Sequence, residues 1–178
     1  MRADARRNYA LLLEVAEQAI AEQGADASLE QIARTAGVGS GTVRRHFPTR
    51  HALLEAVFRR QIDALSARAD ELAGHPDARA ALVDWLNAVL SFAATTRGVA
   101  EALNRDPVEP HEHCATARLT EAGAPLVRRA AGTLTPGVTI TDLLHLITGI
   151  ALATEHLPDR AAEADRLLRL TVAGVSPG

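Results

Sequence analysis

Apolar residues recur at helical spacing along almost the whole of this sequence, and no stretch of useful length alternates as a β-strand does. The spacing predicts helices over about 6–23, 28–36, 40–47, 51–74, 77–96, 114–134, 139–156 and 158–174, with a short helix or turn over 99–104. We therefore expect an all-α protein of about nine helices. Aromatic residues make up only 3% of the chain, so its core must consist mainly of leucine, alanine, valine and isoleucine.

Residues typical of helix N-caps indicate where several of the predicted helices begin. Ser28 followed by Gln31 predicts a capping box, Thr49 predicts an N-cap after Pro48, and Thr139 with Asp142 predicts another capped start. The clearest boundary is the Gly-His-Pro sequence at 74–76. We expect a first helical domain over 1–50, a linking helix over 51–74, and a second helical domain over 75–178.

The charges are unevenly distributed. All 19 basic residues are arginine, which we attribute mainly to compositional bias of a bacterial genome. Residues 1–60 carry nine arginines and seven acids, whereas residues 61–178 carry ten arginines and fifteen acids. The net charge of −3 argues against a globally basic nucleic-acid coat, but this distribution places an anionic partner at the front of the chain.

The sequence indicates a cytoplasmic bacterial protein without a cofactor. Cys114 is the only cysteine, so no intrachain disulfide forms. No apolar run reaches membrane-spanning length, and no signal core follows the N-terminus. His111, His113 and Cys114 resemble a metal cluster, but their spacing matches no strong zinc pattern, and we expect no metal there.

A helix-turn-helix is predicted over 28–47, where glycines at 37 and 39 join two short helices. In the second helix Val43 and Phe47 lie four residues apart and share a face, which we expect to be buried. Thr42, Arg44 and Arg45 then face outward behind a small polar tip, Ser40 and Gly41. Such a helix suits the major groove of DNA, because arginine binds guanine edges or phosphates.

Residues 6–60 resemble the DNA-binding domain of TetR-family transcriptional regulators. The resemblance rests on LLLEVAEQAIAEQG followed by SLEQIARTAGVGSGTVRRHFPTRHALLEAV, in this order and spacing. It implies a homodimeric, ligand-responsive repressor that binds a palindromic operator. The rest of the chain matches the family only in size and helical character.

The resemblance also implies roles for single residues. Ser28, His46 and Arg50 match phosphate contacts, and Ser40, Gly41 and Thr42 match the start of the recognition helix. The sequence departs from the family at Arg44, where a tyrosine is usual. Arginine there removes an apolar contact and adds a donor fork for guanine or phosphate.

The second domain carries candidate residues for an apolar ligand pocket. Trp85 and Phe92 lie seven residues apart on one helix face, and either line a pocket or form ordinary core. The candidate pocket residues are Trp85, Phe92, Leu103, Leu119, Leu146 and Ile150. They predict a small apolar or aromatic effector.

Two further alternatives remain open, and one histidine has a single expected role. The apolar helix over 143–153 and the last helix predict a homodimer through 139–173, or burial within one chain. Tyr9 packs under the first domain or touches DNA. His145 lies in an apolar helix and is expected to be a core histidine.

We predict a repressor, not an enzyme. A small helical enzyme is the rival, but the sequence offers no nucleophile–base pairing and no glycine loop following a strand. A ligand-independent DNA-binding protein is the second rival.

Overall fold

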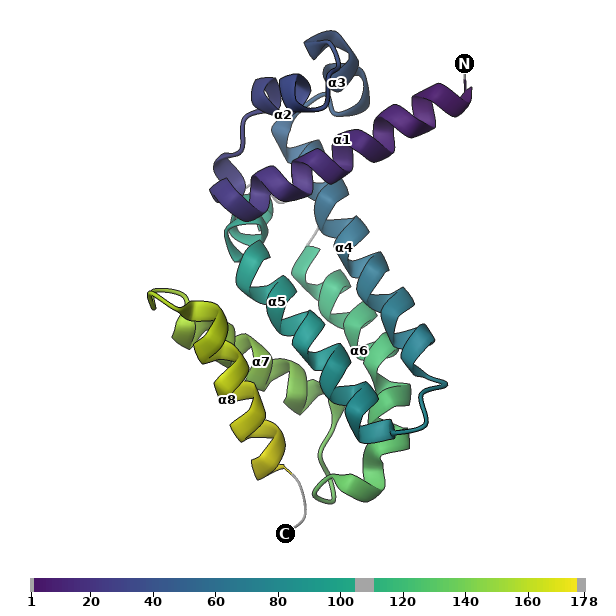
Figure 1. The fold of residues 1–178 in the computed structure, drawn as a ribbon, viewed down its shortest axis with the longest axis vertical. Coiled ribbons are helices and arrows are strands. Elements are labelled where there is room, and N and C mark those ends of the chain that lie inside the picture. Colours follow the sequence, from purple (N-terminus) through teal and green to yellow (C-terminus); the bar gives the residue numbers. More distant parts are fainter. Residues whose placement is uncertain (1, 105–110, 176–178) are drawn as a thin grey trace. The chain divides into compact units, whose positions relative to one another are not determined.

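The computed structural model describes residues 2–104 and 111–175. Within them the chain forms eight α-helices, two short 3-10 helices and no strand, which confirms the all-α prediction (Figure 1). The helices are α1 (Arg2–Gln23), α2 (Leu29–Thr35), α3 (Ser40–His46), α4 (Arg50–Leu72), α5 (Ala78–Asn104), α6 (His111–Ala130), α7 (Ile140–Thr154) and α8 (Arg160–Gly174). The 3-10 helices are η1 (Gly24–Asp26) and η2 (Ala131–Thr133).

The predicted break between residues 96 and 99 is wrong, because α5 continues from Ala78 to Asn104. The threonines at 95 and 96 and the glycine at 98 are weak helix formers, but each costs at most about 1 kcal/mol relative to alanine. Packing outweighs that cost: Thr96 is only 3% exposed. One long helix in place of two accounts for the difference between eight helices and about nine.

The chain divides into two compact units, which we call the N-terminal unit (residues 1–61 and 95–111) and the C-terminal unit (residues 62–94 and 112–178). In the N-terminal unit α1 lies across α2 and α3 (Figure 1). Its predicted inner stripe, including Leu12, Ala16 and Ile20, is buried. The other main core residues of this unit are Ile32, Ala33, Val43, Phe47, Leu53, Leu54 and Val57.

One arginine fastens α4 to α1 inside the N-terminal unit. The Arg60 guanidinium donates to the carbonyl oxygen of Ala10 at 3.3 Å and lies 3.3 Å from a carboxylate oxygen of Glu17. Burial raises the pKa of Glu17, while Arg60 opposes that rise. This arrangement holds the middle of α4 against α1.

In the C-terminal unit the end of α4, the start of α5 and α6 pack around Trp85, which is fully buried. Its indole N–H donates to the carbonyl oxygen of Leu65 at 2.9 Å. The main surrounding core residues are Ile62, Leu72, Leu82, Leu86, Val89, Leu119, Leu126, Ile140, Leu143, Ile147 and Leu168.

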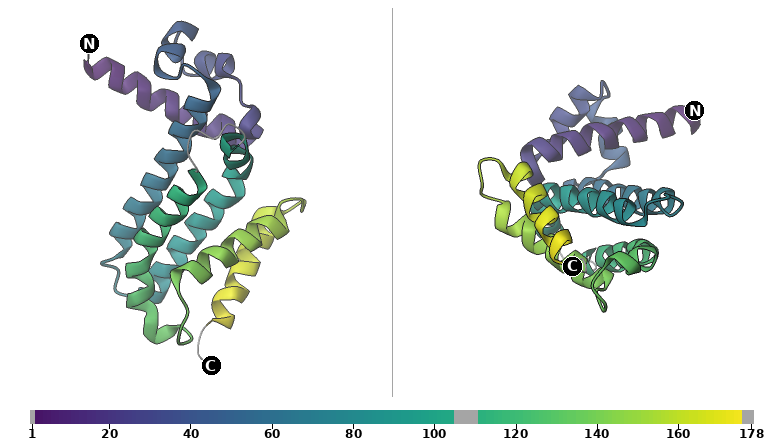
Figure 2. Two further views of the ribbon diagram at one scale, coloured as in Figure 1. Left: turned by 180° about the vertical axis from the view of Figure 1, so that it is seen from behind. Right: turned by 60° about the horizontal axis from the view of Figure 1, so that its bottom comes forward.

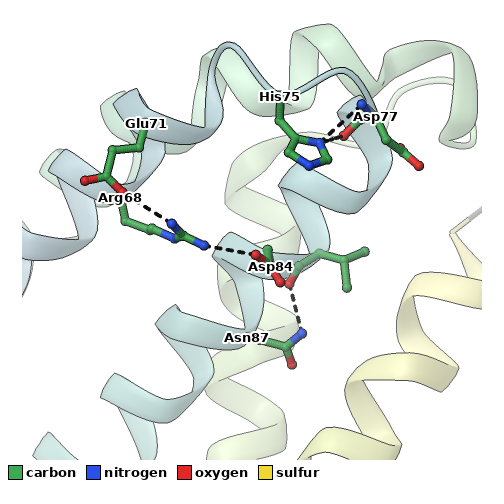
Figure 3. Close-up of polar contacts among 7 residues, drawn as sticks. Arg68, Glu71, His75, Asp77, Asp84 and Asn87 are labelled. Carbon is green, nitrogen blue, oxygen red and sulfur yellow. Dashed lines mark hydrogen bonds and ion pairs between the residues drawn. The ribbon is translucent and has the colours of Figure 1, made fainter.

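Polar contacts support the antiparallel pair that α4 and α5 form in this unit (Figure 3). Arg68 on α4 binds Glu71 at 3.3 Å and reaches Asp84 on α5 at 3.1 Å. The predicted end of one helix and start of the next around 74–76 is confirmed, since α4 ends at Leu72 and α5 begins at Ala78. Arg129 of α6 donates to the carbonyl oxygens of Leu72 at 3.2 Å and His75 at 2.6 Å, which caps the end of α4.

The last two helices, α7 and α8, lie side by side in both views of Figure 2. The predicted capping box at the start of α7 is confirmed: Thr139 accepts from the backbone N–H of Asp142, and the Asp142 carboxylate accepts from the N–H of Thr139. The prediction that His145 is buried is wrong, because its side chain is exposed on α7. Apolar neighbours in sequence do not decide which face of a helix a residue occupies.

Candidate nucleic-acid interface

The turn between α2 and α3 is built by local hydrogen bonds. Ser28 caps α2 by accepting from the backbone N–H of Gln31 at 3.4 Å, which is one half of the predicted capping box. At the other end Gly37 adopts φ +66°, a left-handed conformation that favours glycine. Its N–H donates to Arg34 and the N–H of Val38 donates to Ala33, so α2 ends in a Schellman motif. This end turns the chain sharply into α3.

The two faces of α3 separate apolar from basic side chains as predicted. Val43 is 1% exposed and Phe47, the C-cap residue of α3, is 2% exposed. Arg44 and Arg45 are exposed, and the Arg44 side chain retains 72% of its accessible surface. Burial of one face thus presents two guanidinium groups to the solvent. Such groups bind phosphate oxygens or the edge of guanine.

The tip of α3 is small and open. Gly39 is the N-cap residue, Ser40 and Gly41 are exposed, and Thr42 is half-buried. No heavy atom of a neighbouring group lies within 4 Å of a Cβ placed on Gly41. The protein itself therefore does not require glycine at this position, whereas close approach of a partner to the backbone does favour it.

An aromatic cluster holds the end of α3 against α1. The ring of Tyr9 stacks on Phe47 with centroids 5.3 Å apart and lies 5.6 Å from the ring of His46. Tyr9 therefore packs within the N-terminal unit, the first of its two predicted roles, although 38% of its surface stays exposed. His46 is half-buried, so its ring is oriented by this packing. The aromatic contact gives His46 a defined position beside the exposed arginines.

Two acids that sequence reasoning missed accompany the predicted DNA-binding arginines. Glu30 on α2 lies 3.9 Å from Arg44, and Asp26 in η1 lies 3.0 Å from Arg50 at the start of α4. The only sequence signal is that both acids flank Ser28, which does not reveal their partners. The predicted N-cap Thr49 is confirmed, since its hydroxyl accepts from the N–H of Ala52 at 3.1 Å.

The candidate pocket residues in the C-terminal unit differ in burial. Trp85 is 0% exposed and its N–H is bonded within the protein, as in an ordinary core residue. Leu119 and Ile150 are buried and Phe92 is half-buried, whereas Leu146 is 42% exposed. The side chain of Leu103 lies outside the described residues.

Glycine at 123 on α6 makes room for the indole ring. A Cβ at this position would lie 2.6 Å from two ring atoms of Trp85 and 2.6 Å from the terminal methyl of Ile140. Ordinary van der Waals contact begins near 3.4 Å. The ring therefore fills the space beside α6, and sequence patterns gave no indication of this close approach.

The paired helices α7 and α8 expose apolar side chains. Leu146 and Leu152 on α7 are 42% and 44% exposed, and Leu170 on α8 is 57% exposed. Gly149 lies between the two α7 leucines, and a Cβ there would meet nothing within 4 Å. The opposite face of α7, with Leu143, Ile147 and Ile150, is buried in the chain. α7 is thus apolar on two faces, only one of which the chain itself covers.

Within the described parts of the chain, no three histidine, cysteine or acidic side chains gather as a metal site would require. The side chains of His111, His113 and Cys114 lie outside that description. Among the described residues, no helix is both long and apolar enough to span a membrane.

Comparisons with known proteins agree with this geometry. Residues 12–57 match the family model described as bacterial regulatory proteins, tetR family. Residues 77–177 match that of the transcriptional regulator SbtR-like C-terminal domain.

Solved structures extend the likeness over the whole chain. A TetR transcriptional regulator from Streptomyces coelicolor is 34% identical with a TM-score of 0.76, over 94% of this chain and 97% of that one. A TetR regulatory protein from Mycobacterium vanbaalenii is 31% identical with a TM-score of 0.70, over 99% of both. The regulator FadR from Bacillus subtilis, solved with stearoyl-CoA, shares the fold at 19% identity and a TM-score of 0.63, over 94% and 99% of the two chains. Since both family models and full-length relatives match, this chain belongs to the TetR family of transcriptional regulators.

Proposed function

We propose that this protein is a repressor that binds a palindromic operator as a homodimer and is released by a small-molecule effector. The observation that carries the proposal is α3: Val43 and Phe47 are buried, and this directs Arg44 and Arg45 outward. In this proposal residues 1–50 bind DNA, the helix over 51–74 links them to the rest, and residues 75–178 bind the effector and the second subunit.

Each predicted DNA-binding residue has a place in this proposal. Ser40, Gly41 and Thr42 enter the major groove first, because they form the tip of α3. Arg44 and Arg45 follow on the exposed face and bind base edges or phosphates. Ser28, His46 and Arg50 bind phosphates around the groove.

A dimer through α7 and α8 is supported by their exposed leucines. The side chains of Leu146, Leu152 and Leu170 are exposed to solvent. Burying them against a second copy of the chain removes apolar surface from water, which favours association. Gly149 permits close approach of the two copies of α7. In this proposal two α7–α8 pairs form a four-helix bundle. The two recognition helices bind half-sites that are spaced by one helical turn of DNA, about 34–36 Å, or a multiple of it.

The effector is proposed to be small and apolar or aromatic, because the buried side chains of the C-terminal unit are mainly leucine, isoleucine, valine and alanine. Phe92, Leu119 and Ile150 are the candidate contacts that this unit supplies within its interior. FadR, which shares the fold, was solved with stearoyl-CoA, a ligand with a long apolar chain. The likeness supports the presence of a ligand site, and not the identity of the ligand.

In this proposal α4 transmits effector binding to the DNA-binding residues and so releases the protein from its operator. This helix begins in the N-terminal unit and ends in the C-terminal unit. An effector that prefers the conformation with the wrong spacing of recognition helices shifts the population away from DNA. A coupling of about 1–3 kcal/mol changes the operator affinity by roughly 5- to 150-fold. Neither step is catalytic, and we propose that the protein acts in the cytoplasm without a cofactor.

The test is selection of bound duplexes from a random pool at fixed moderate salt. Wild type is compared with Arg44→Ala/Arg45→Ala and with Arg128→Ala, which removes an exposed arginine from α6, outside both the DNA-binding residues and the α7–α8 pair. We expect wild type and the control to enrich an inverted repeat and the first variant to lose it. Equal enrichment by all three would show that α3 does not read the sequence.

A further inference from the structure

Two predicted DNA-binding arginines form ion pairs with acids of the same unit. The Arg44 guanidinium lies 3.9 Å from the Glu30 carboxylate, and that of Arg50 lies 3.0 Å from Asp26. Both acids precede their partners in the segment that leads into and through α2. The face that is expected to meet DNA therefore carries negative charge directly beside its positive charge.

A hydrogen bond orients the Glu30 carboxylate that pairs with Arg44. The carboxylate accepts from the Ser28 hydroxyl at 3.0 Å, and Glu30 lies in the first turn of α2. The backbone N–H of Glu30 and then the Ser28 hydroxyl lower the pKa of the Glu30 carboxyl. The group is consequently ionised throughout the neutral range. Ser28 and Arg44, which are expected to donate hydrogen bonds to a DNA phosphate or base, thus both contact the Glu30 carboxylate instead.

Asp26 repeats the arrangement at the start of α4. Its side chain is almost fully exposed, and its single described polar contact is the bond from Arg50. Because exposed ion pairs contribute little to stability, neither acid is needed to hold the fold. Their main electrostatic effect is on what approaches the arginines.

We propose that Glu30 and Asp26 set the specificity of DNA binding by engaging Arg44 and Arg50 until a phosphate or base displaces them. This inference rests on the proposed function. A duplex that offers only phosphates must displace both carboxylates and tolerate their repulsion. A duplex that also offers matched bases gains contacts that compensate. The two acids therefore weaken non-specific binding more than operator binding.

The size of the effect follows from counterion release. The logarithm of the binding constant falls with the logarithm of the salt concentration with a slope of about −0.9 for each phosphate neutralised. Removing one acid frees one arginine to neutralise one further phosphate. Between 50 and 200 mM salt, a slope that is steeper by about 0.9 amounts to a change of about threefold in relative affinity. Removing both acids raises this to about tenfold.

The experiment uses the full-length protein with Glu30→Gln, Asp26→Asn and the double variant, each of which removes charge with little change in shape. Binding to the selected inverted repeat and to a random-sequence duplex of equal length is measured by fluorescence anisotropy from 50 to 200 mM salt. Glu22→Gln is the matched control, because Glu22 is an exposed acid on α1 of the same unit and its described partner is the neutral Gln18. Thermal unfolding of each variant checks that the fold is unchanged.

We expect both single variants to bind the random duplex more tightly at 50 mM salt, with a steeper salt dependence, and the preference for the inverted repeat to fall. Slopes and affinities equal to those of Glu22→Gln would overturn the inference. So would weaker binding of Glu30→Gln to the inverted repeat alone, since Glu30 would then position Arg44 for reading. A failure of the proposed function is distinct: wild type and Arg44→Ala/Arg45→Ala would bind every duplex equally or not at all.

Discussion

Replacing glycine by alanine at position 123 tests how tightly the core of the C-terminal unit is packed. The new methyl group would lie 2.6 Å from the Trp85 ring and from the terminal methyl of Ile140. Neither neighbour moves freely, since Trp85 is 0% and Ile140 7% exposed. The hydrogen bond from the indole N–H to Leu65 at 2.9 Å further restrains the ring.

The expected cost follows from two opposing effects. Overpacking a core by one methyl group costs about 1–3 kcal/mol, because side chains must leave their preferred rotamers or move the backbone. Alanine is a better helix former than glycine and returns about 1 kcal/mol. We therefore expect Gly123→Ala to lower the free energy of unfolding by up to about 2 kcal/mol. The same exchange at an unobstructed helix position does not lower it.

Trp85 reports directly on this site, because it is the only tryptophan of the chain. Urea unfolding is followed by its fluorescence at fixed protein concentration, for wild type, Gly123→Ala and Gly174→Ala. Gly174 ends α8 and has nothing within 4 Å of an added Cβ, so this control is expected to stay within about 0.5 kcal/mol of wild type.

A double-mutant cycle identifies the cause. Ile140→Val removes the terminal methyl that the new Cβ would meet, and alone costs about 0.5–1.5 kcal/mol. In combination with Gly123→Ala it is expected to cost less than the sum of the two single variants. A Gly123→Ala protein that is more stable than wild type, with unchanged emission from Trp85, would refute the account of the packing.

Three further outcomes are expected. Thr139→Ala removes the N-cap of α7 and should cost about 1 kcal/mol at pH 7 in urea unfolding. Because hydrogen bonds from Thr139 lower the pKa of Asp142 below its usual 3.8, the stability from this contact is fully present above that pH. It is lost as the pH falls through the lowered pKa, which acid unfolding followed by circular dichroism measures. Gly37→Ala forces a side chain into the left-handed region and should cost about 1–2 kcal/mol, whereas a gain in stability would contradict the Schellman end of α2. Leu146→Asp and Leu170→Asp should yield folded monomers in sedimentation experiments, and a dimer that survives both would exclude the α7–α8 interface.

Several predictions from the sequence were correct because they depend on neighbours within a few residues. The caps at Ser28, Thr49 and Thr139 satisfy the first N–H groups of a helix, and each needs only one side chain at the right position. Gly37 adopts a positive φ that other residues rarely do. The separation of Val43 from Arg44 follows from the 3.6-residue period of the helix.

Other features depended on residues far apart in the chain. No pattern in the neighbouring sequence predicts that Trp85 requires a glycine at 123, because the close contact exists only once α5 and α6 pack together. The burial of Thr96 within α5 and the exposure of His145 on α7 likewise reflect which helix face finds a partner.

The sequence alone determined the class of fold, the helix-turn-helix and the exposure of its arginines, since periodicity and capping act over one or two turns. Only the tertiary structure decided that Arg44 faces Glu30 and that Arg50 faces Asp26, 24 positions away. The pairing of charges requires two segments to be brought within a few ångströms, and the turn between α2 and α3 and the packing of α4 supply that proximity. The sequence thus predicts which arginines are exposed on the recognition helix, whereas the acidic partner of each arginine is decided by the fold.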